Sequence, residues 1–258
     1  MINIKIEERN IVANILPATT KKISLLWLGG YLSSLDGSKA SYLADYAARS
    51  GLGLVRFDFS HTAMSSESAK TLPVFCEKDV PVREDFLKTC LSDWLADSKY
   101  MYDNYTDNGI IVGSSCGGWI ALLLALELEK AGRTPKALVL LAPAPDFTKY
   151  LPNYDMSKLD IHGYVYINEG DVNLPFSKKF LHEAKKYYIL KEPLDISCPI
   201  YIIHGGKDNI VPVEHCLELI SYLSLCNVNF TYIKDADHGL SRPQDLEKLS
   251  QIISSIEC

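Results

Sequence analysis

At the middle of the chain lies the stretch Ile110-Ile-Val-Gly-Ser-Ser115-Cys-Gly-Gly-Trp119. It matches the pattern G-x-S-x-G with Ser115 at its centre, and an apolar helical stretch, 117–131, follows. In such a strand–turn–helix the serine occupies a sharp turn, which small residues two positions before and after it allow to close. The free N–H groups at the start of the helix face the place where negative charge develops. The stretch therefore predicts a nucleophilic Ser115 and an oxyanion donor in the amide of Cys116.

The pattern around this turn alternates between strands and helices. Short apolar runs predict strands at 11–15, 23–28, 53–59, 109–113, 137–142, 199–204 and 229–233. Helical spacing or helix-start signals predict helices at 39–50, 82–95, 117–131, 212–225 and 243–256. Alternation of this kind is typical of a mainly parallel sheet covered by helices on both faces. The sequence thus predicts one α/β domain over residues 1–258, built on a mostly parallel central sheet.

Residues 145–191 interrupt the alternation. They contain Pro145, Pro152 and Pro175 among many scattered tyrosines and phenylalanines, and no clean strand pattern. A long insertion after a late strand is most simply a lid or cap over a substrate pocket. The alternative is a group of helices that only shields the edge of the sheet.

A base for Ser115 should be a histidine, because its ordinary pKa lies close to neutral pH. In this type of fold the chain order is serine, acid, histidine, with the histidine after the last strand. Among six histidines, His238 has that position, in Lys234-Asp-Ala-Asp-His238. His61 lies in a loop at the same end of the sheet, where it could reach a substrate.

The acid is expected after the preceding strand. Asp208 follows His204-Gly-Gly-Lys, so it is well placed to accept the Nδ1–H of His238. Asp235 and Asp237 are weaker alternatives, because a close neighbour in sequence rarely faces the imidazole correctly. These residues predict a triad of Ser115, Asp208 and His238.

A second oxyanion donor is expected from the loop after an early strand. The stretch Leu25-Leu-Trp-Leu-Gly-Gly30-Tyr31 ends a predicted strand at two glycines. We therefore predict that the amide of Tyr31 joins that of Cys116. No phosphate-binding loop, dinucleotide fingerprint or zinc motif is present in the sequence, so neither a metal nor a cofactor is implied.

The composition of the chain disfavours some classes of binding partner. The 258 residues carry a net charge of −6, which disfavours binding to nucleic acid or an anionic membrane surface. No apolar run is long enough to span a membrane. The seven cysteines form no C-x-x-C pair, and the first ten residues resemble neither a signal nor a transit peptide. We expect a cytoplasmic protein with free thiols that acts on a small-molecule or acyl-protein substrate, with no stable membrane insertion; the oligomeric state is left open.

The chain resembles the α/β-hydrolase superfamily, and within it the branch of mitochondrial palmitoyl-protein thioesterases, also described as acyl-glucuronide esterases. The shared blocks include Gly30-Tyr-Leu-Ser33, Gly37-Ser-Lys-Ala40, Arg56-Phe-Asp-Phe-Ser60 and Gly113-Ser-Ser-Cys-Gly-Gly-Trp119. The resemblance implies an esterase or thioesterase that uses Ser115, Asp208 and His238. The chain departs from the branch at His61-Thr62, in residues 145–191 and in having no transit peptide. A peptidase of the same fold and a non-catalytic binding protein remain the alternatives.

Overall fold

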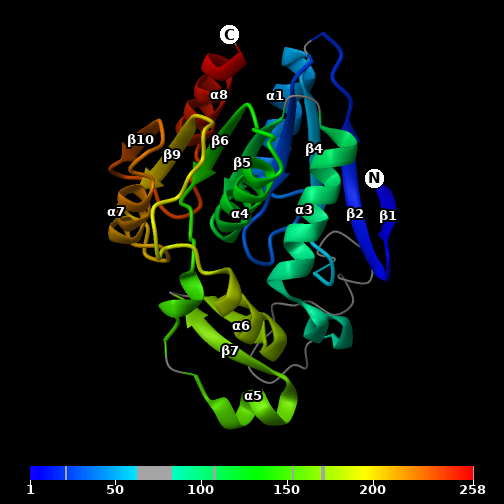
Figure 1. Ribbon diagram of the computed structural model, residues 1–258, viewed down its shortest axis with the longest axis vertical. Helices are drawn as coiled ribbons and strands as arrows, with labels where there is room; N and C mark the ends of the chain where they lie inside the picture. The colour runs from blue at the N-terminus through cyan, green and yellow to red at the C-terminus, as the bar shows by residue number, and fades with distance from the viewer. Residues whose placement is uncertain (21, 63–82, 107–108, 153, 170–171, 258) are drawn as a thin grey trace.

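The apolar runs form the strands of a central sheet. The computed structural model describes residues 1–20, 22–62, 83–106, 109–152, 154–169 and 172–257. Within these ranges the main sheet has eight strands in the order β1-β2-β4-β3-β5-β6-β9-β10 (Figure 1). Their bounds are β1 (Ile2–Ile6), β2 (Arg9–Leu16), β3 (Ser24–Leu28), β4 (Gly53–Asp58), β5 (Ile110–Ser114), β6 (Ala137–Leu141), β9 (Ile200–Gly205) and β10 (Val228–Ile233).

The main sheet is mostly parallel, as predicted. From β4 to β10 neighbouring strands run parallel, whereas β2 pairs antiparallel with both β1 and β4. The predicted strand at 11–15 is longer in the structure, and β1 was not predicted. The polar residues Asn3 and Lys5 of β1 alternate with Ile4 and Ile6, which pack on the core from one side only.

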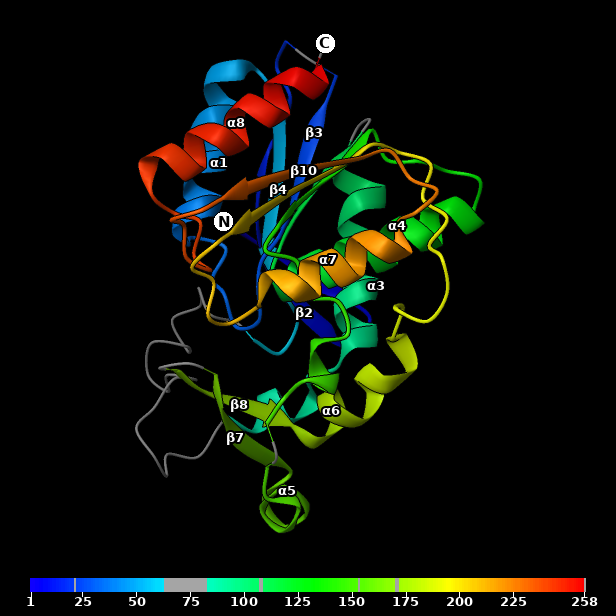
Figure 2. The same cartoon turned by 90° about the vertical axis from the view of Figure 1, so that its left-hand side faces the viewer.

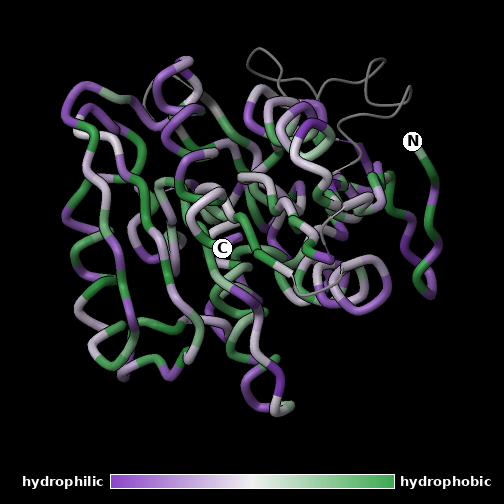
Figure 3. Tube along the Cα trace, turned by 90° about the horizontal axis from the view of Figure 1, so that it is seen from above, coloured by the Kyte–Doolittle hydropathy of each residue, from purple (hydrophilic) through white to green (hydrophobic). Residues whose placement is uncertain are grey.

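Helices cover both faces of the main sheet (Figures 1 and 2). Helices α1 (Ser38–Ser50) and α8 (Pro243–Glu257) contribute to one apolar core. Helices α3 (Leu91–Tyr105), α4 (Cys116–Lys130) and α7 (Val213–Tyr222) contribute to the other. Successive residues of a strand enter opposite cores: Leu26 lies in one, and Leu25 and Trp27 lie in the other. Figure 3 shows outer helices whose turns alternate between hydrophilic and hydrophobic residues, as expected of helices that bury one side.

The helix predicted at 82–95 is wrong in its bounds. Val82 lies outside the described residues, and the apolar spacing is divided between the 3-10 helix η1 (Glu84–Lys88) and the start of α3. Cys90 separates the two with an extended backbone (φ −155°, ψ 156°). The Thr89 hydroxyl donates to the carbonyl of Phe86, a local bond that competes with continuation of a helix.

The described residues between 145 and 191 form a separate layer below the main sheet in the views of Figures 1 and 2. The described residues there contain η2 (Phe147–Lys149), α5 (Met156–His162), an antiparallel hairpin of β7 (Tyr164–Glu169) and β8 (Val172–Ser177), α6 (Lys178–Ala184) and η3 (Lys185–Tyr187). The sequence shows no clean strand pattern in this segment, and the hairpin β7–β8 was not predicted. The buried Asp146 joins the two ends of the segment, because its carboxylate accepts the amides of Ile189 and Leu190 at 2.8 and 3.0 Å.

Candidate active site

Ser115 lies on the turn between β5 and α4. Its backbone has φ 54° and ψ −121°, a conformation that is strained for any residue with a side chain. A Cβ on Gly113 would lie 2.5 Å from the carbonyl oxygen of Gly117, and a Cβ on Gly117 would lie 2.1 Å from the carbonyl oxygen of Leu28. Only glycine fits at these two positions, which explains the G-x-S-x-G spacing. The turn is fixed to the sheet by the amide of Ser115, which donates to the carbonyl of Leu141 at 2.9 Å.

The loop after β3 passes directly beside Ser115. A Cβ on Gly30 would lie 3.4 Å from the Cβ of Ser115, so Tyr31 follows at a point next to the serine. Cys116 is the first residue of α4 and is buried. Both residues predicted to donate to the oxyanion are therefore near Ser115, Cys116 as the next residue in the chain and Tyr31 in the loop after β3.

Asp208 and His238 meet at the ends of β9 and β10. The Nδ1 atom of His238 lies 2.7 Å from Oδ2 of Asp208. The other oxygen, Oδ1, accepts the amides of Ile210 and Val211 at 3.0 and 2.8 Å. The Asp208 side chain is fully buried, and that of His238 is about one quarter exposed, at 24%. Both oxygens of the buried carboxylate are thus satisfied, and one imidazole nitrogen of His238 is fixed.

The environment keeps Asp208 ionised. Burial alone would raise its pKa, but the hydrogen bond and charge interaction with His238, together with the two backbone amides, bring the pKa below its ordinary value. The rival acid Asp235 is engaged elsewhere, because Arg242 binds its carboxylate at 2.8 Å. The carboxylate of Asp237 accepts the amide of Leu240 at 3.2 Å.

Two residues that support this pair were not singled out as functional by the sequence. The fully buried His204 lies behind Asp208, with Nε2 3.0 Å from the carbonyl oxygen of Val211 and 3.6 Å from Oδ2 of Asp208. The ammonium of Lys39, on α1, donates to the carbonyl of Gly239, the residue after His238. Burial lowers the pKa of Lys39, against the opposing effect of the nearby Asp237 and Asp208. The only signal in the sequence for Lys39 was the Gly37-Ser-Lys-Ala40 block.

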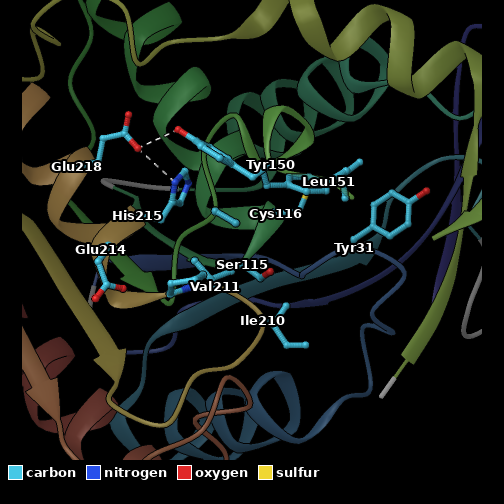
Figure 4. Close-up of a pocket in the computed structure, with 13 residues that line it drawn as sticks. Tyr31, Ser115, Cys116, Tyr150, Leu151, Ile210, Val211, Glu214, His215 and Glu218 are labelled. Atoms are coloured by element: carbon cyan, nitrogen blue, oxygen red, sulfur yellow. Dashed lines mark hydrogen bonds and ion pairs between the residues drawn. The ribbon is translucent and has the colours of Figure 1, made fainter. Parts of the chain in front are cut away.

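A cavity of about 320 Å³ opens beside Ser115. Figure 4 shows Ser115 near its middle, with Tyr31 to one side and His215 and Glu218 to the other. Residues 144–151 and the start of α7 supply most of the wall, and Asp208 and His238 are not part of the lining. The lining residues are Tyr31, Ser115, Cys116, Ala144, Phe147, Tyr150, Leu151, Ile210, Val211, Pro212, Glu214, His215 and Glu218.

His61 lies apart from this cavity. Its Nε2 is 3.8 Å from Oδ2 of Asp93, and burial lowers its pKa. The expectation that this loop could reach a substrate has no support in the lining of the cavity.

The described ranges lack two further kinds of feature. No group of three or more His, Cys, Asp or Glu side chains is arranged there to hold a metal ion. No helix in these ranges combines the length and the apolar character needed to cross a bilayer.

Comparison with known proteins shows the family of this chain. Residues 81–253 match the model of the prolyl oligopeptidase family. The chain is 28% identical over 247 residues to the mitochondrial palmitoyl-protein thioesterase ABHD10 of Homo sapiens, an alignment that covers 92% of this chain and 73% of that one.

Solved structures share the fold. A putative hydrolase from Agrobacterium vitis S4 has a TM-score of 0.81 and 30% identity, with 100% of this chain and 97% of that chain covered. Mouse alpha/beta hydrolase domain-containing protein 10 has a TM-score of 0.75 and 22% identity, with coverages of 98% and 96%. The expected α/β-hydrolase fold is thereby confirmed.

The expectation of a cytoplasmic protein is contradicted by the same comparisons. The curated relatives from Homo sapiens and Mus musculus are mitochondrial proteins. The expectation rested on the composition of ten residues and on cysteine usage, and neither records where a folded chain resides.

Proposed function

The chain belongs to the prolyl oligopeptidase family of α/β hydrolases, and from that membership we propose that it is a serine hydrolase of carboxylic esters or thioesters. In this proposal Ser115 is the nucleophile, His238 the general base and Asp208 the residue that orients the imidazole. The observation that carries it is the 2.7 Å contact between His238 and the buried Asp208, at the same end of the sheet as the strained Ser115.

The proposed reaction has two steps. His238 takes the proton of the Ser115 hydroxyl as its oxygen attacks the acyl carbon, and then gives that proton to the departing alcohol or thiol. The amides of Tyr31 and Cys116 hold the negative oxygen of the tetrahedral intermediate. Water, deprotonated by His238, then attacks the acyl-enzyme, releases the carboxylic acid and restores Ser115.

The role of Asp208 follows from its contacts. The ionised carboxylate accepts two backbone amides on Oδ1, and Oδ2 is the acceptor for the Nδ1–H hydrogen bond of His238. The Nδ1 atom then carries the hydrogen, and Nε2 remains free to act as the base.

We propose that residues 145–191 act as a cap on this site. Phe147, Tyr150 and Leu151 of the segment line the cavity together with Ser115. These three side chains make that wall largely apolar, which suits an acyl or aryl group. The thioesterase activity in the name of the human relative supports acyl esters and thioesters as the substrate class.

A peptidase is the second candidate, because the matching family model is that of the prolyl oligopeptidases. An amide and an ester with the same acyl group would separate the two. We expect hydrolysis of the ester and no measurable cleavage of the amide; amide cleavage that depends on Ser115 would establish the peptidase.

The first experiment is hydrolysis of a thioester series from acetyl to palmitoyl by the wild type and by Ser115→Ala. We expect turnover that depends on Ser115 and increases with chain length. Activity limited to short chains would retain the serine mechanism and make the enzyme a small-ester carboxylesterase. Equal activity of the two proteins would refute the assignment of Ser115.

A fluorophosphonate probe tests the non-catalytic alternative. Such probes phosphonylate an activated serine with loss of fluoride, so we expect labelling of the wild type and none of Ser115→Ala. A folded wild type that resists the probe would indicate a binding protein on a hydrolase scaffold.

The mitochondrial relatives also support a mitochondrial location for this protein. Fractionation of cells that express it from its own gene would test this, with enrichment in the mitochondrial fraction as the expected result.

A further inference from the structure

The cavity beside Ser115 has an aromatic side and a polar side. Its wall near Tyr31 is aromatic, whereas the part built by Tyr150 and α7 carries the polar groups (Figure 4). We propose that this polar part, formed by Tyr150, Glu214, His215 and Glu218, excludes anionic groups. The site would then take neutral or cationic esters and reject esters that also carry a free carboxylate. This inference rests on the proposed serine hydrolase and specifies its substrate class.

Glu218 is fixed in position at the cavity. Its Oε2 accepts the hydroxyl of Tyr150 at 2.9 Å and lies 3.6 Å from Nδ1 of His215. The rings of Tyr150 and His215 meet edge to face, with centroids 4.9 Å apart. Burial and the hydrogen bond to Glu218 raise the pKa of Tyr150 to about 12, so the hydroxyl stays neutral and donates to the carboxylate. The negative charge is therefore held against the cavity wall by a neutral partner.

His215 does not offer its other nitrogen to a ligand. Nε2 lies 2.7 Å from the carbonyl oxygen of Pro145, and since a carbonyl only accepts, Nε2 carries a hydrogen and donates it. The His215 side chain is only 9% exposed. An incoming anion would thus meet Glu218 rather than a free imidazole N–H.

The other charged groups near the cavity do not neutralise the negative charge of this part of the wall. The N-terminus of α7 contributes about half a positive charge, but Glu214 lies in the first turn and offsets it. Of the described residues that line the cavity, none is Lys or Arg. The nearby Lys149 is paired with Asp146 at 2.7 Å, and Lys39 donates to Gly239. Two carboxylates therefore dominate the electrostatics of this part of the wall.

The consequence concerns selectivity. A substrate with a terminal carboxylate brings a like charge toward Glu214 and Glu218, which destabilises both its complex and its transition state. An acyl-glucuronide carries such a carboxylate, so the inference separates it from neutral acyl esters and thioesters. Glu218 should contribute roughly a three- to tenfold selectivity, the range expected for a partly exposed charge, and the exposed Glu214 a smaller factor in the same direction.

The experiment uses pairs of esters that differ only in charge. One pair carries the charge on the acyl group: the 4-nitrophenyl esters of adipic acid and of its monoamide. The second pair carries it on the leaving group: the hexanoyl esters of 4-hydroxybenzoate and 4-hydroxybenzamide. The readout is the ratio of kcat/KM for the anionic ester to kcat/KM for the neutral ester, which cancels general changes in activity.

Glu218→Gln is the central variant, because glutamine keeps the shape and the acceptor for Tyr150 but removes the charge. We expect it to raise the anionic-to-neutral ratio about three- to tenfold in at least one ester pair, with Glu214→Gln acting in the same direction. The effect should shrink at high salt, because screening weakens it. Glu247→Gln, on the exposed side of α8, makes the same change in net charge and should leave the ratio as it is.

Tyr150→Phe separates charge from architecture. It removes the hydrogen bond that holds Glu218 and keeps both carboxylates, so the anionic-to-neutral ratio should rise less than it does in Glu218→Gln. If Glu218→Gln and Glu214→Gln leave the ratio unmoved in both pairs while Ser115-dependent hydrolysis of the neutral esters persists, the charge selection is wrong. If the neutral esters are not hydrolysed, or are hydrolysed equally by Ser115→Ala, the proposed function itself fails.

Discussion

The loops of the main sheet and the segment 145–191 face the same cavity but are held in place differently. Ser115, Asp208 and His238 each follow a parallel strand, and backbone bonds fix these loops: the amides of Gly206 and Lys207 both donate at 2.8 Å to carbonyls of the β10 strand and its loop. The segment instead attaches through side chains. The hydroxyl of Tyr31 donates to the carbonyl of Pro175 at 2.8 Å, and its ring stacks on Phe176 at 4.6 Å.

The loops of the sheet hold the proposed reacting groups, whereas the segment 145–191 shapes the cavity. Parallel strands end at one edge of a sheet, so their loops converge whatever the side chains are, and a reacting group placed there is held by the backbone. A segment held by aromatic packing can change its composition without disturbing that edge. Substitutions in the loops should therefore alter the rate of the reaction, and substitutions in the segment should alter stability and selectivity.

The largest effect tests the sheet side of this comparison. Ser115→Ala removes the proposed nucleophile and should lower kcat by about 10⁴- to 10⁶-fold, with the melting temperature almost unchanged. Steady-state kinetics and thermal unfolding of the same sample measure both. A large drop in melting temperature would mean that the turn contributes to folding as well as to chemistry.

Asp208→Asn should lower kcat by about 10⁴-fold, because the amide can donate to Nδ1 and so favours the wrong tautomer of His238. Asp235→Asn is the matched control on the neighbouring loop, where the carboxylate binds Arg242, and should retain most of the activity. A loss of activity in Asp235→Asn alone would assign the acid to that residue.

The contact between Asp208 and His238 can also be tested through the pH dependence of stability. The folded state lowers the pKa of Asp208, so ionised Asp208 stabilises the fold above its unfolded pKa of about 3.9, and this stability is lost as pH falls through the lower, folded value. The difference in unfolding free energy between the wild type and Asp208→Asn should therefore shrink below about pH 4. Urea unfolding at several pH values measures it; a difference that grows on acidification would contradict the direction of the shift.

Phe176→Ala tests how closely the segment is joined to the sheet. Phe176 is fully buried and belongs to the same apolar core as Trp94 of α3, so its loss should lower the free energy of unfolding by about 3–5 kcal/mol in a single transition. Differential scanning calorimetry distinguishes this from two transitions, which would show that the segment unfolds independently. Tyr164→Ala, at the less buried start of β7, is the milder comparison.

The smallest effect concerns the contact that joins the two regions. Tyr31→Phe removes one hydrogen bond, to the carbonyl of Pro175, and keeps the ring in its aromatic cluster. We expect a loss of about 1 kcal/mol in stability and a reduction in kcat of less than tenfold. An unchanged stability would show that water replaces the hydroxyl at no cost.

Several parts of the fold could be read from local patterns. The strands β3, β5 and β6 are short apolar runs because they are covered on both faces, and α4 is apolar nearly all round for the same reason. The G-x-S-x-G spacing reflects contacts of a few residues with one another and with the end of β3. The cues for β1 and the hairpin β7–β8 were weak, because β1 is buried on one side only and the proline-containing β8 lies in a layer outside the main sheet.

Order along the chain and residue type were enough to single out Ser115, Asp208 and His238, since the chemistry of each group and the topology of a parallel sheet limit the choices. Three features depended on the folded chain: the hydrogen bond from Lys39 to the loop of His238, the support of Asp208 by His204, and the carboxylate of Glu218 in the wall of the cavity. No local sequence pattern predicts any of these contacts. Lys39 and Gly239 are separated by 200 positions in the sequence, and His204 and Asp208 by four. Local sequence encodes backbone preference and chemistry, whereas such contacts arise only when the sheet and the segment pack together.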